Sequence, residues 1–287
     1  MEIQRSLYSR QTRRHIVDRL MTVVLTLSAL FAAGLLVLIL GYVIFRGYSA
    51  LNLAFFTQPP LPVGEVGGGI APAILGTLTM LSIAALLGVP IGLATAIYLS
   101  EYGRGRLASM TRFVIDLLAG LPSIVVGVFV WALVVRHVIG NFSGFAGAVA
   151  LAIIIIPITT RTAEEIIRLV PDSLREASTA LGTRRWRTIL SVVLPTARAG
   201  LVTGTVLALA RAGGETAPLL LTALGNQFFN FDLRQPMAAL PIQIYNYAVS
   251  PYDDWHTKAW GGAFVLIMLI AVFSLLTRIL SARSVRR

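Results

Sequence analysis

Cysteine is absent from the 287-residue sequence, and charged residues are scarce. Without cysteine the chain has no disulfide framework, thiolate metal site or cysteine nucleophile. The three histidines, His15, His137 and His256, lie in unrelated segments and predict no metal site. Only 13% of the residues are charged, whereas 56% are hydrophobic and the mean hydropathy is +0.79. This balance lies outside the range of soluble proteins and indicates an integral membrane protein.

Apolar runs of about 20 residues, the length that crosses a hydrocarbon core of about 30 Å, occur six times. They predict an all-α polytopic membrane protein with six transmembrane helices, at 20–45, 70–99, 112–135, 145–157 (or 143–160), 194–224 and 259–280. Within the second run, Gly88 and Gly92 form a small-xxx-small pattern that predicts close helix packing. We divide the chain into a basic cytoplasmic tail (1–19), a first transmembrane helix (20–45), a periplasmic loop (46–69), a core of five transmembrane helices (70–280) and a second cytoplasmic tail (281–287).

Basic residues are distributed asymmetrically along this topology. With both termini in the cytoplasm, 19 of the 24 Lys and Arg residues fall on the cytoplasmic side, in agreement with the positive-inside rule. The net charge of +11 comes from arginines that are scattered over several loops, which argues against a nucleic-acid-binding surface. Membrane lipid headgroups are the expected neighbours of these arginines.

Two opposite charges interrupt the fifth predicted span. Arg211 and Glu215 lie four residues apart among apolar and small residues, and Thr216 follows them. On one helix this spacing brings the two charges to the same face, where they can pair. An ionisable residue at bilayer depth costs at least about 2.5–3.5 kcal/mol, so it is usually paired, inward-facing and functional. We expect this segment to line a transport pathway, with Arg211 meeting an anion; the alternative is a static Arg–Glu clamp that only packs helices.

The cytoplasmic loop at 161–195 is more than a connector. Pro171 suits the first turn of a helix, Gly182 can adopt the left-handed conformation that ends it, and Thr183 can cap a second short helix. Two short amphipathic helices joined at a glycine would form a knob that projects into the cytoplasm. An interfacial helix lying on lipid is the alternative.

The same loop carries a recognisable motif. Glu176-Ala177-Ser178, three residues, Gly182, nine residues and Val192-Val193-Leu194-Pro195 resembles the EAA loop of ABC importer permeases. Ser178 and Val192 replace the usual Ala and Ile, and the spacing is kept. The resemblance implies a type I ABC importer permease fold, in which Glu176, Ala177 and Gly182 belong to coupling helices that insert into cytoplasmic ATPase subunits.

Further segments, at 118–127, 210–218, 221–227 and 237–241 with Tyr245, resemble the PstA-type permeases of phosphate-specific ABC importers. The resemblance implies a permease that moves inorganic phosphate across the bacterial cytoplasmic (inner) membrane by alternating access. It also implies a homologous PstC-type second permease, two copies of a PstB-type ATPase and a periplasmic or lipid-anchored PstS-type phosphate-binding protein. Because the sequence has no Gly-x-x-x-x-Gly-Lys-[Ser/Thr] loop, we expect no catalysis and no cofactor in this chain, with ATP and magnesium bound by the partner ATPase.

Other functions remain open from the residues alone. One alternative is a permease of the same architecture that carries another oxyanion, such as molybdate or sulfate. Another is a membrane scaffold or sensor for phosphate signalling, in which the loop docks a regulator. The aromatic-rich external segment 225–258 is either an interfacial belt or a docking surface for an external partner.

Overall fold

The computed structural model describes residues 2–62, 64–65 and 67–285, and side chains from residue 15 to 275 outside the gaps, together with that of residue 279. The predicted tails 1–19 and 281–287 therefore lie partly outside the described residues. The regular secondary structure of the described part is helical, with one isolated β-bridge between Leu224 and Met237 and irregular segments between the helices. In chain order, with η for 3-10 or π segments, the elements are α1 (Glu2–Gly47), η1 (Tyr48–Ala50), α2 (Leu53–Thr57), α3 (Ala71–Ile97), η2 (Tyr98–Tyr102), α4 (Gly105–Gly120), α5 (Ser123–Val130), η3 (Trp131–Ile139), α6 (Gly144–Arg168), α7 (Asp172–Ala180), α8 (Arg185–Thr188), η4 (Ile189–Val193), α9 (Leu194–Gly213), α10 (Ala217–Leu220), α11 (Leu240–Ala248) and α12 (Asp253–Val285).

Five helical stretches among the described residues are long and apolar enough to cross a membrane, or six if a bent pair counts as one span. The five are His15–Ala50, Ala71–Tyr102, Gly144–Arg168, Arg185–Gly213 and Asp253–Leu275. The predicted all-α class with several membrane-spanning helices is confirmed.

The third predicted span, 112–135, is not one straight helix. α4 ends at Gly120, and Gly105–Gly120 meets Ser123–Ile139 at an angle of 103°. Leu121 takes an extended conformation (φ −68°, ψ 136°), as a residue before proline prefers, and Pro122 precedes the first turn of α5. The predicted span is therefore a sharply broken pair, because the extended Leu121 and the following Pro122 end α4.

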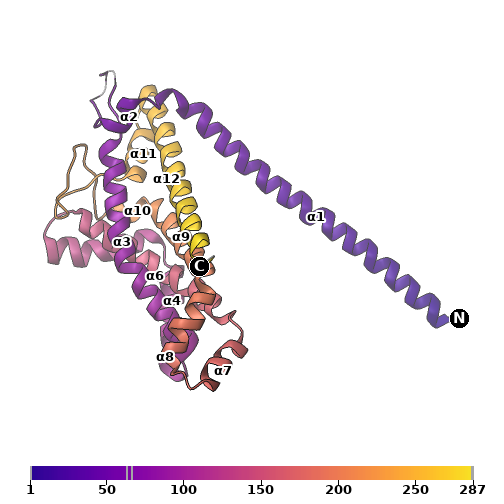
Figure 1. The fold of residues 1–287 in the computed structure, drawn as a ribbon. Helices are drawn as coiled ribbons and strands as arrows, with labels where there is room; N and C mark the ends of the chain where they lie inside the picture. The colour runs from indigo at the N-terminus through magenta and orange to yellow at the C-terminus, as the bar shows by residue number, and fades with distance from the viewer. Residues whose placement is uncertain (1, 63, 66, 286–287) are drawn as a thin grey trace.

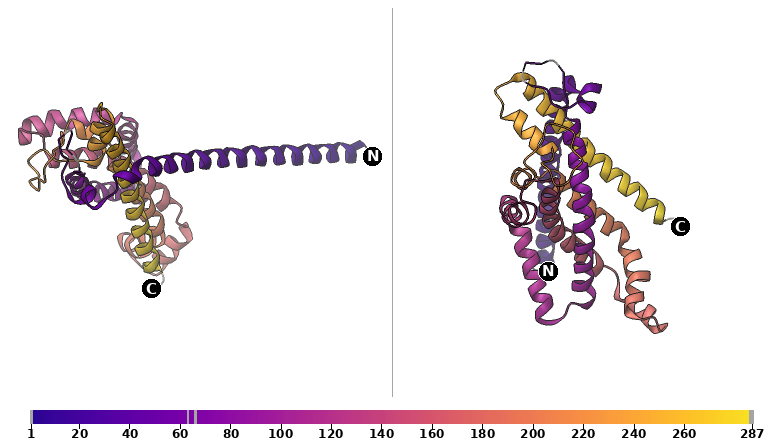
Figure 2. Two further views of the ribbon diagram at one scale, coloured as in Figure 1. Left: turned by 90° about the horizontal axis from the view of Figure 1, so that it is seen from above. Right: turned by 90° about the vertical axis from the view of Figure 1, so that its left-hand side faces the viewer.

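Helix α1 stands apart from the rest of the molecule. In Figures 1 and 2 it leaves the body near α12 and α2 and extends away from it, and the side chains from 15 to 39 are all exposed. It touches the body at its C-terminal end, where Gly47 lies against the backbone of Trp260 and Gly261 and the Tyr42 ring packs edge-on to Trp260. An apolar helix without protein around it requires lipid or another subunit as its cover.

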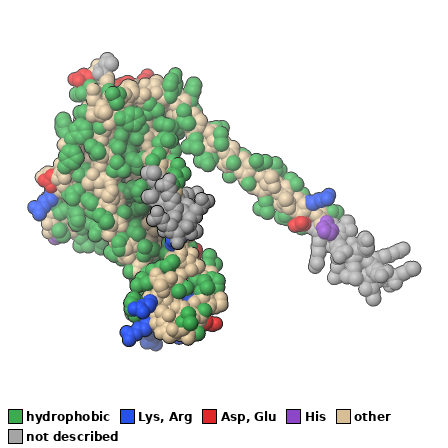
Figure 3. Space-filling view, viewed as in Figure 1, with side chains coloured by type: hydrophobic (Ala, Val, Ile, Leu, Met, Phe, Trp, Pro, Cys, Tyr) green, Lys and Arg blue, Asp and Glu red, His purple; other side chains and the backbone are tan. Residues whose placement is uncertain are grey.

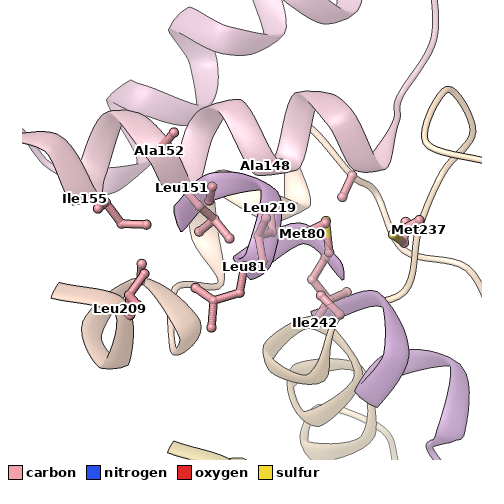
Figure 4. Close-up of a cluster of buried hydrophobic side chains, with 14 of the residues drawn as sticks. Met80, Leu81, Ala148, Leu151, Ala152, Ile155, Leu209, Leu219, Met237 and Ile242 are labelled. Carbon is pink, nitrogen blue, oxygen red and sulfur yellow. The ribbon is translucent and has the colours of Figure 1, made fainter. Parts of the chain in front are cut away.

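The buried core forms where α3 crosses α6 and α9 (Figure 4). Its largest side chains include Met80 and Leu81 of α3, Leu151 and Ile155 of α6, and Leu209 of α9. The predicted small-xxx-small packing is found here as well. A Cβ at Gly88 would lie 3.0 Å from the Ile155 side chain, and one at Gly92 would lie 2.8 Å from that of Thr159. The two glycines therefore let α3 and α6 approach closely.

The segment 225–258, predicted to be external, folds back onto α3 through residues that precede α12. A Cβ at Gly76 would lie 2.0 Å from the Ala238 carbonyl oxygen, and the backbone N–H of Leu240 donates to the Thr77 hydroxyl at 2.7 Å. Its aromatic side chains divide into two groups. Phe228 and Phe231 are exposed, whereas Tyr247 is buried, and this desolvation raises the pKa of its phenol. The segment is thus part core and part outer surface.

Candidate transport and coupling sites

The charged segment of the fifth predicted span lies at a break in the helix. α9 ends at Gly213, Gly214 follows with φ −94° and ψ 0°, and α10 begins only at Ala217. The predicted span 194–224 is therefore one helix only as far as Gly213 and is broken beyond it. α9 ends here because Gly213 and Gly214 favour a helix weakly and Pro218 restricts the backbone that follows.

The break also changes the relation between Arg211 and Glu215. Glu215 lies beyond the end of α9, and among the side chains that the structure describes no ion pair or hydrogen bond holds Arg211. The predicted pairing on one helix face is therefore wrong in this conformation. The Arg211 side chain is exposed and sits in the last turn of α9, where the negative end of the helix dipole favours a cation. Glu215 and Thr216 are half-buried.

A close contact fixes the far side of the break. A Cβ at Gly127 of α5 would lie 2.7 Å from Cα of Pro218 in α10. The bent α4–α5 pair thus reaches the short helix that follows Glu215 and Thr216. Non-helical backbone at membrane depth is tolerated only inside protein or beside a water-filled cavity, so this part of the chain suits either of these places better than a lipid-facing surface.

The predicted cytoplasmic knob consists of α7 and α8. No residue of α7 is buried, and Glu176 and Ala177 are exposed. Gly182 follows α7 with φ +78° and has open space where a Cβ would be, so its left-handed conformation turns the chain as predicted. Thr183 does not cap α8, however. The N-cap position is Arg184, and its side chain makes no capping bond.

The knob presents apolar groups next to cations. Leu181 is 87% exposed and Trp186 50% exposed, and the Arg187 guanidinium lies over the Trp186 ring. Figure 3 shows Lys and Arg side chains gathered at this end of the molecule, beside exposed hydrophobic ones. Inside the knob, the hydroxyls of Ser178 and Thr188 are 2.9 Å apart and join α7 to α8. Such a surface suits a protein partner better than water.

A buried carboxylate ties together the helices above the knob. The Glu164 side chain of α6 is 3% exposed and accepts from Arg112 Nε at 2.9 Å and Arg168 Nη2 at 2.6 Å. Arg161 also pairs with it, and with Asp116 of α4. Burying a carboxylate is tolerable because several cations surround it. Glu164 was not among the predicted site residues; the signal for it in the sequence is a carboxylate shortly after an apolar run.

A second buried carboxylate reaches the knob itself. Glu101 of η2 accepts from Arg175 of α7 through Nη2 at 2.8 Å and Nε at 3.1 Å, and its side chain is 5% exposed. Arg175 also donates to the carbonyls of Ile167 and Val170 at the end of α6. From α8, Arg185 donates to the Glu101 backbone carbonyl. Neither Glu101 nor Arg175 was among the site residues predicted from the sequence.

Comparison with known proteins places these features in a family. Residues 88–287 match the family model described as "Binding-protein-dependent transport system inner membrane component". The phosphate transport system permease protein PstA of Yersinia pestis is 42% identical over 275 residues, which cover 96% of this chain and 93% of that protein. Its counterpart in Pasteurella multocida is 44% identical, over 93% of this chain and 95% of its own length.

Solved structures show the same fold at low sequence identity. A chain of the MetNI methionine ABC transporter, in inward-facing conformations, superimposes with a TM-score of 0.62 and 20% identity over 75% of this chain and 95% of that chain. A chain of a bacterial alginate ABC transporter gives 0.60 and 15% identity, over 89% and 95%. The predicted fold of an ABC importer permease is therefore confirmed.

Proposed function

The chain belongs to the family of binding-protein-dependent transport system inner membrane components, and from this membership we propose how it serves a phosphate importer. It acts as the permease subunit of an ABC transporter that carries inorganic phosphate, as the named function of its close relatives supports. The permease forms the pathway and is not itself a catalyst. ATP and magnesium are bound by a partner ATPase, which supplies the free energy.

One observation carries the proposed pathway. Arg211 is a cation in the last turn of α9. Its side chain is exposed in the isolated chain and has no partner among the described side chains. A guanidinium presents a planar fork of N–H donors that matches phosphate oxygens and replaces part of the water that phosphate loses. The charge is therefore available to a travelling anion.

Glu215 and Thr216 complete the proposed pathway segment. Their half-buried side chains lie just beyond the helix break, close along the chain to Arg211. The Thr216 hydroxyl can donate to a phosphate oxygen. The Glu215 carboxylate repels an anion, and transport requires a site from which the substrate also leaves. We infer that Arg211 attracts phosphate while Glu215 prevents its tight retention.

The knob is the proposed docking element for the ATPase. Glu176 and Ala177 lie on an exposed helix, Gly182 sets the turn that follows, and Leu181 supplies an apolar tip. Two PstB-type ATPase copies would be engaged by the pair of permeases, one through this knob and one through that of a homologous PstC-type subunit. Exposed α1 and the broken α4–α5 pair offer apolar surface for that second permease.

The remaining partners follow from the topology. With the knob and both termini in the cytoplasm, the segment 225–258 lies on the opposite side, where a periplasmic or lipid-anchored PstS-type protein would deliver phosphate. The exposed Phe228 and Phe231 belong to that face.

Competitive uptake tests the substrate directly. Reconstituted complex should accumulate labelled phosphate in the presence of ATP, and excess unlabelled phosphate should abolish the signal. Excess molybdate or sulfate should leave uptake unchanged. Inhibition by molybdate or sulfate at the same concentration as the unlabelled phosphate would point to another oxyanion as substrate. If no phosphate accumulates either with or without ATP, the scaffold role would be favoured.

The docking assignment has its own test. Glu176→Lys should lower co-purification of the ATPase at least about fivefold, because it reverses a charge on the exposed docking helix. Glu165→Lys is the matched control, since Glu165 is an exposed acid of α6 outside the knob. Normal ATPase recovery with Glu176→Lys, or equal loss with both variants, would contradict the assignment.

A further inference from the structure

The knob touches the transmembrane body at a small number of polar contacts. α7 follows α6 in the chain, and α8 continues through η4 into α9, so covalent connections already link the knob to α6 and to α9. α3 has no such connection. Its cytoplasmic continuation, η2, instead offers Glu101, whose side chain is 5% exposed in a molecule with only 13 acidic residues. A buried carboxylate retained at this place calls for a specific partner.

That partner is Arg175, and hydrogen bonds to surrounding groups fix the orientation of its guanidinium. Two of its nitrogens, Nε and Nη2, donate to one oxygen of Glu101 at 3.1 and 2.8 Å. The remaining nitrogen, Nη1, donates to the Val170 carbonyl at 2.5 Å and to Asp172 at 3.1 Å. A guanidinium held at every nitrogen has little freedom to turn, so α7 and η2 are joined in one orientation.

The second helix of the knob is fastened to the same residue. Arg185 of α8 donates to the Glu101 carbonyl, and its guanidinium lies over the ring of Tyr102 at 4.9 Å from the centroid. The Ser178–Thr188 contact closes the unit between α7 and α8. Both knob helices therefore converge on Glu101, one through its side chain and one through its backbone.

We propose that Glu101 is a positioning residue for coupling, which joins the ATPase-docking knob to α3 so that the knob and the cytoplasmic end of α3 move as one body. α3 packs along α6 and α9, and Arg211 belongs to α9. Displacement of the knob by the ATPase would thus reach the Arg211 helix through α3, in addition to the paths through α6 and through the continuous helix from α8 into α9. The inference rests on the proposed role of the knob, and co-purification of the ATPase with Glu176→Lys tests that role separately.

Glu101→Gln tests the proposal with the smallest change. The amide keeps the size and an acceptor oxygen but removes the charge, and a hydrogen bond to a neutral acceptor is weaker than one to a carboxylate. Phosphate moved per ATP hydrolysed should fall about fivefold or more, with ATPase recovery and ATP hydrolysis retained. Asp172→Asn is the control, because Asp172 also pairs with Arg175 but is fully exposed and lies outside η2. A wild-type ratio in Glu101→Gln, or an equal fall in Asp172→Asn, would overturn the proposal.

If the complex carrying Glu101→Gln fails to assemble, a distance measurement tests whether the knob and the cytoplasmic end of α3 move as one body. Since the chain has no cysteine, Ser173→Cys on α7 and Arg104→Cys after η2 take spin labels selectively in a complex whose partners lack reactive cysteines. The 173–104 distance should stay constant under nucleotide conditions that change the distance from 173 to a label at Gln227→Cys on the outer segment. A change in the 173–104 distance under those conditions would refute one-body motion.

Discussion

Gly182 sets the angle between the two helices of the knob. Its φ of +78° lies in the left-handed region, and nothing within 4 Å would meet an added Cβ. The conformation itself, rather than crowding, therefore excludes other residues. A side chain there costs about 1–2 kcal/mol.

Gly182→Ala should accordingly loosen the turn without disturbing the transmembrane body. Amide hydrogen exchange should rise in α7 and α8, and ATPase co-purification should fall severalfold. Gly105→Ala is a matched control, because Gly105 has the same φ of +78° and the same open space but lies at the start of α4. Equal loss of ATPase with both variants would show that general instability, not the knob, is responsible.

Residue-level features differ in how far the sequence could predict them. Gly182 was predictable, because the motif spacing and left-handed preference act locally. The pairing of Arg211 with Glu215 was not, because it depended on a helix that stops at Gly213. The Glu101–Arg175 pair joins residues 74 positions apart, and no local pattern indicates a contact of that kind.

At the scale of elements, the break after α9 is braced by α5. The Gly127 backbone lies so close to Pro218 that a Cβ would come within 2.7 Å of its Cα, which a proline backbone cannot easily yield. Overpacking of this kind typically costs about 1–3 kcal/mol. The position of α10, and with it the segment 214–216, depends on this contact.

Gly127→Ala should therefore displace α10 and lower phosphate uptake while the complex still assembles. Hydrogen exchange should rise in residues 214–221, and the thermal midpoint of the purified complex should drop. Gly120→Ala in the same bent pair is the control, since a Cβ at Gly120 meets nothing within 4 Å. Unchanged exchange at 214–221 in Gly127→Ala would show that α5 does not brace the break.

Hydropathy patterns predict the membrane helices better than the breaks inside them. Apolar runs located the membrane helices, because hydrocarbon thickness fixes their length. They did not reveal the angle of 103° between Gly105–Gly120 and Ser123–Ile139, nor that α9 ends inside its apolar run. The helices on the two sides of each break are both apolar, so hydropathy does not mark the break. Those breaks are set by prolines and glycines together with contacts such as that of Gly127 with Pro218.

The knob lies at the lower end of the body, where Lys and Arg side chains gather, and α11 of the segment 225–258 lies in its upper part (Figures 1 and 3). The positive-inside rule assigns the knob to the cytoplasm. Labelling of single cysteines with a membrane-impermeant maleimide tests this orientation in a chain without native cysteine. Gln227→Cys should react in intact spheroplasts, and Ser173→Cys only after permeabilisation; the reverse pattern would invert the proposed topology.

Phosphate uptake by the reconstituted complex carrying Arg211→Gln shows whether the Arg211 guanidinium meets the transported anion. Charge-assisted hydrogen bonds contribute about 1.5–3 kcal/mol, so uptake should fall at least about tenfold. ATPase recovery should remain normal, and Arg136→Gln, an exposed arginine of η3, should transport like the wild type. Wild-type uptake by the Arg211→Gln complex would contradict the account.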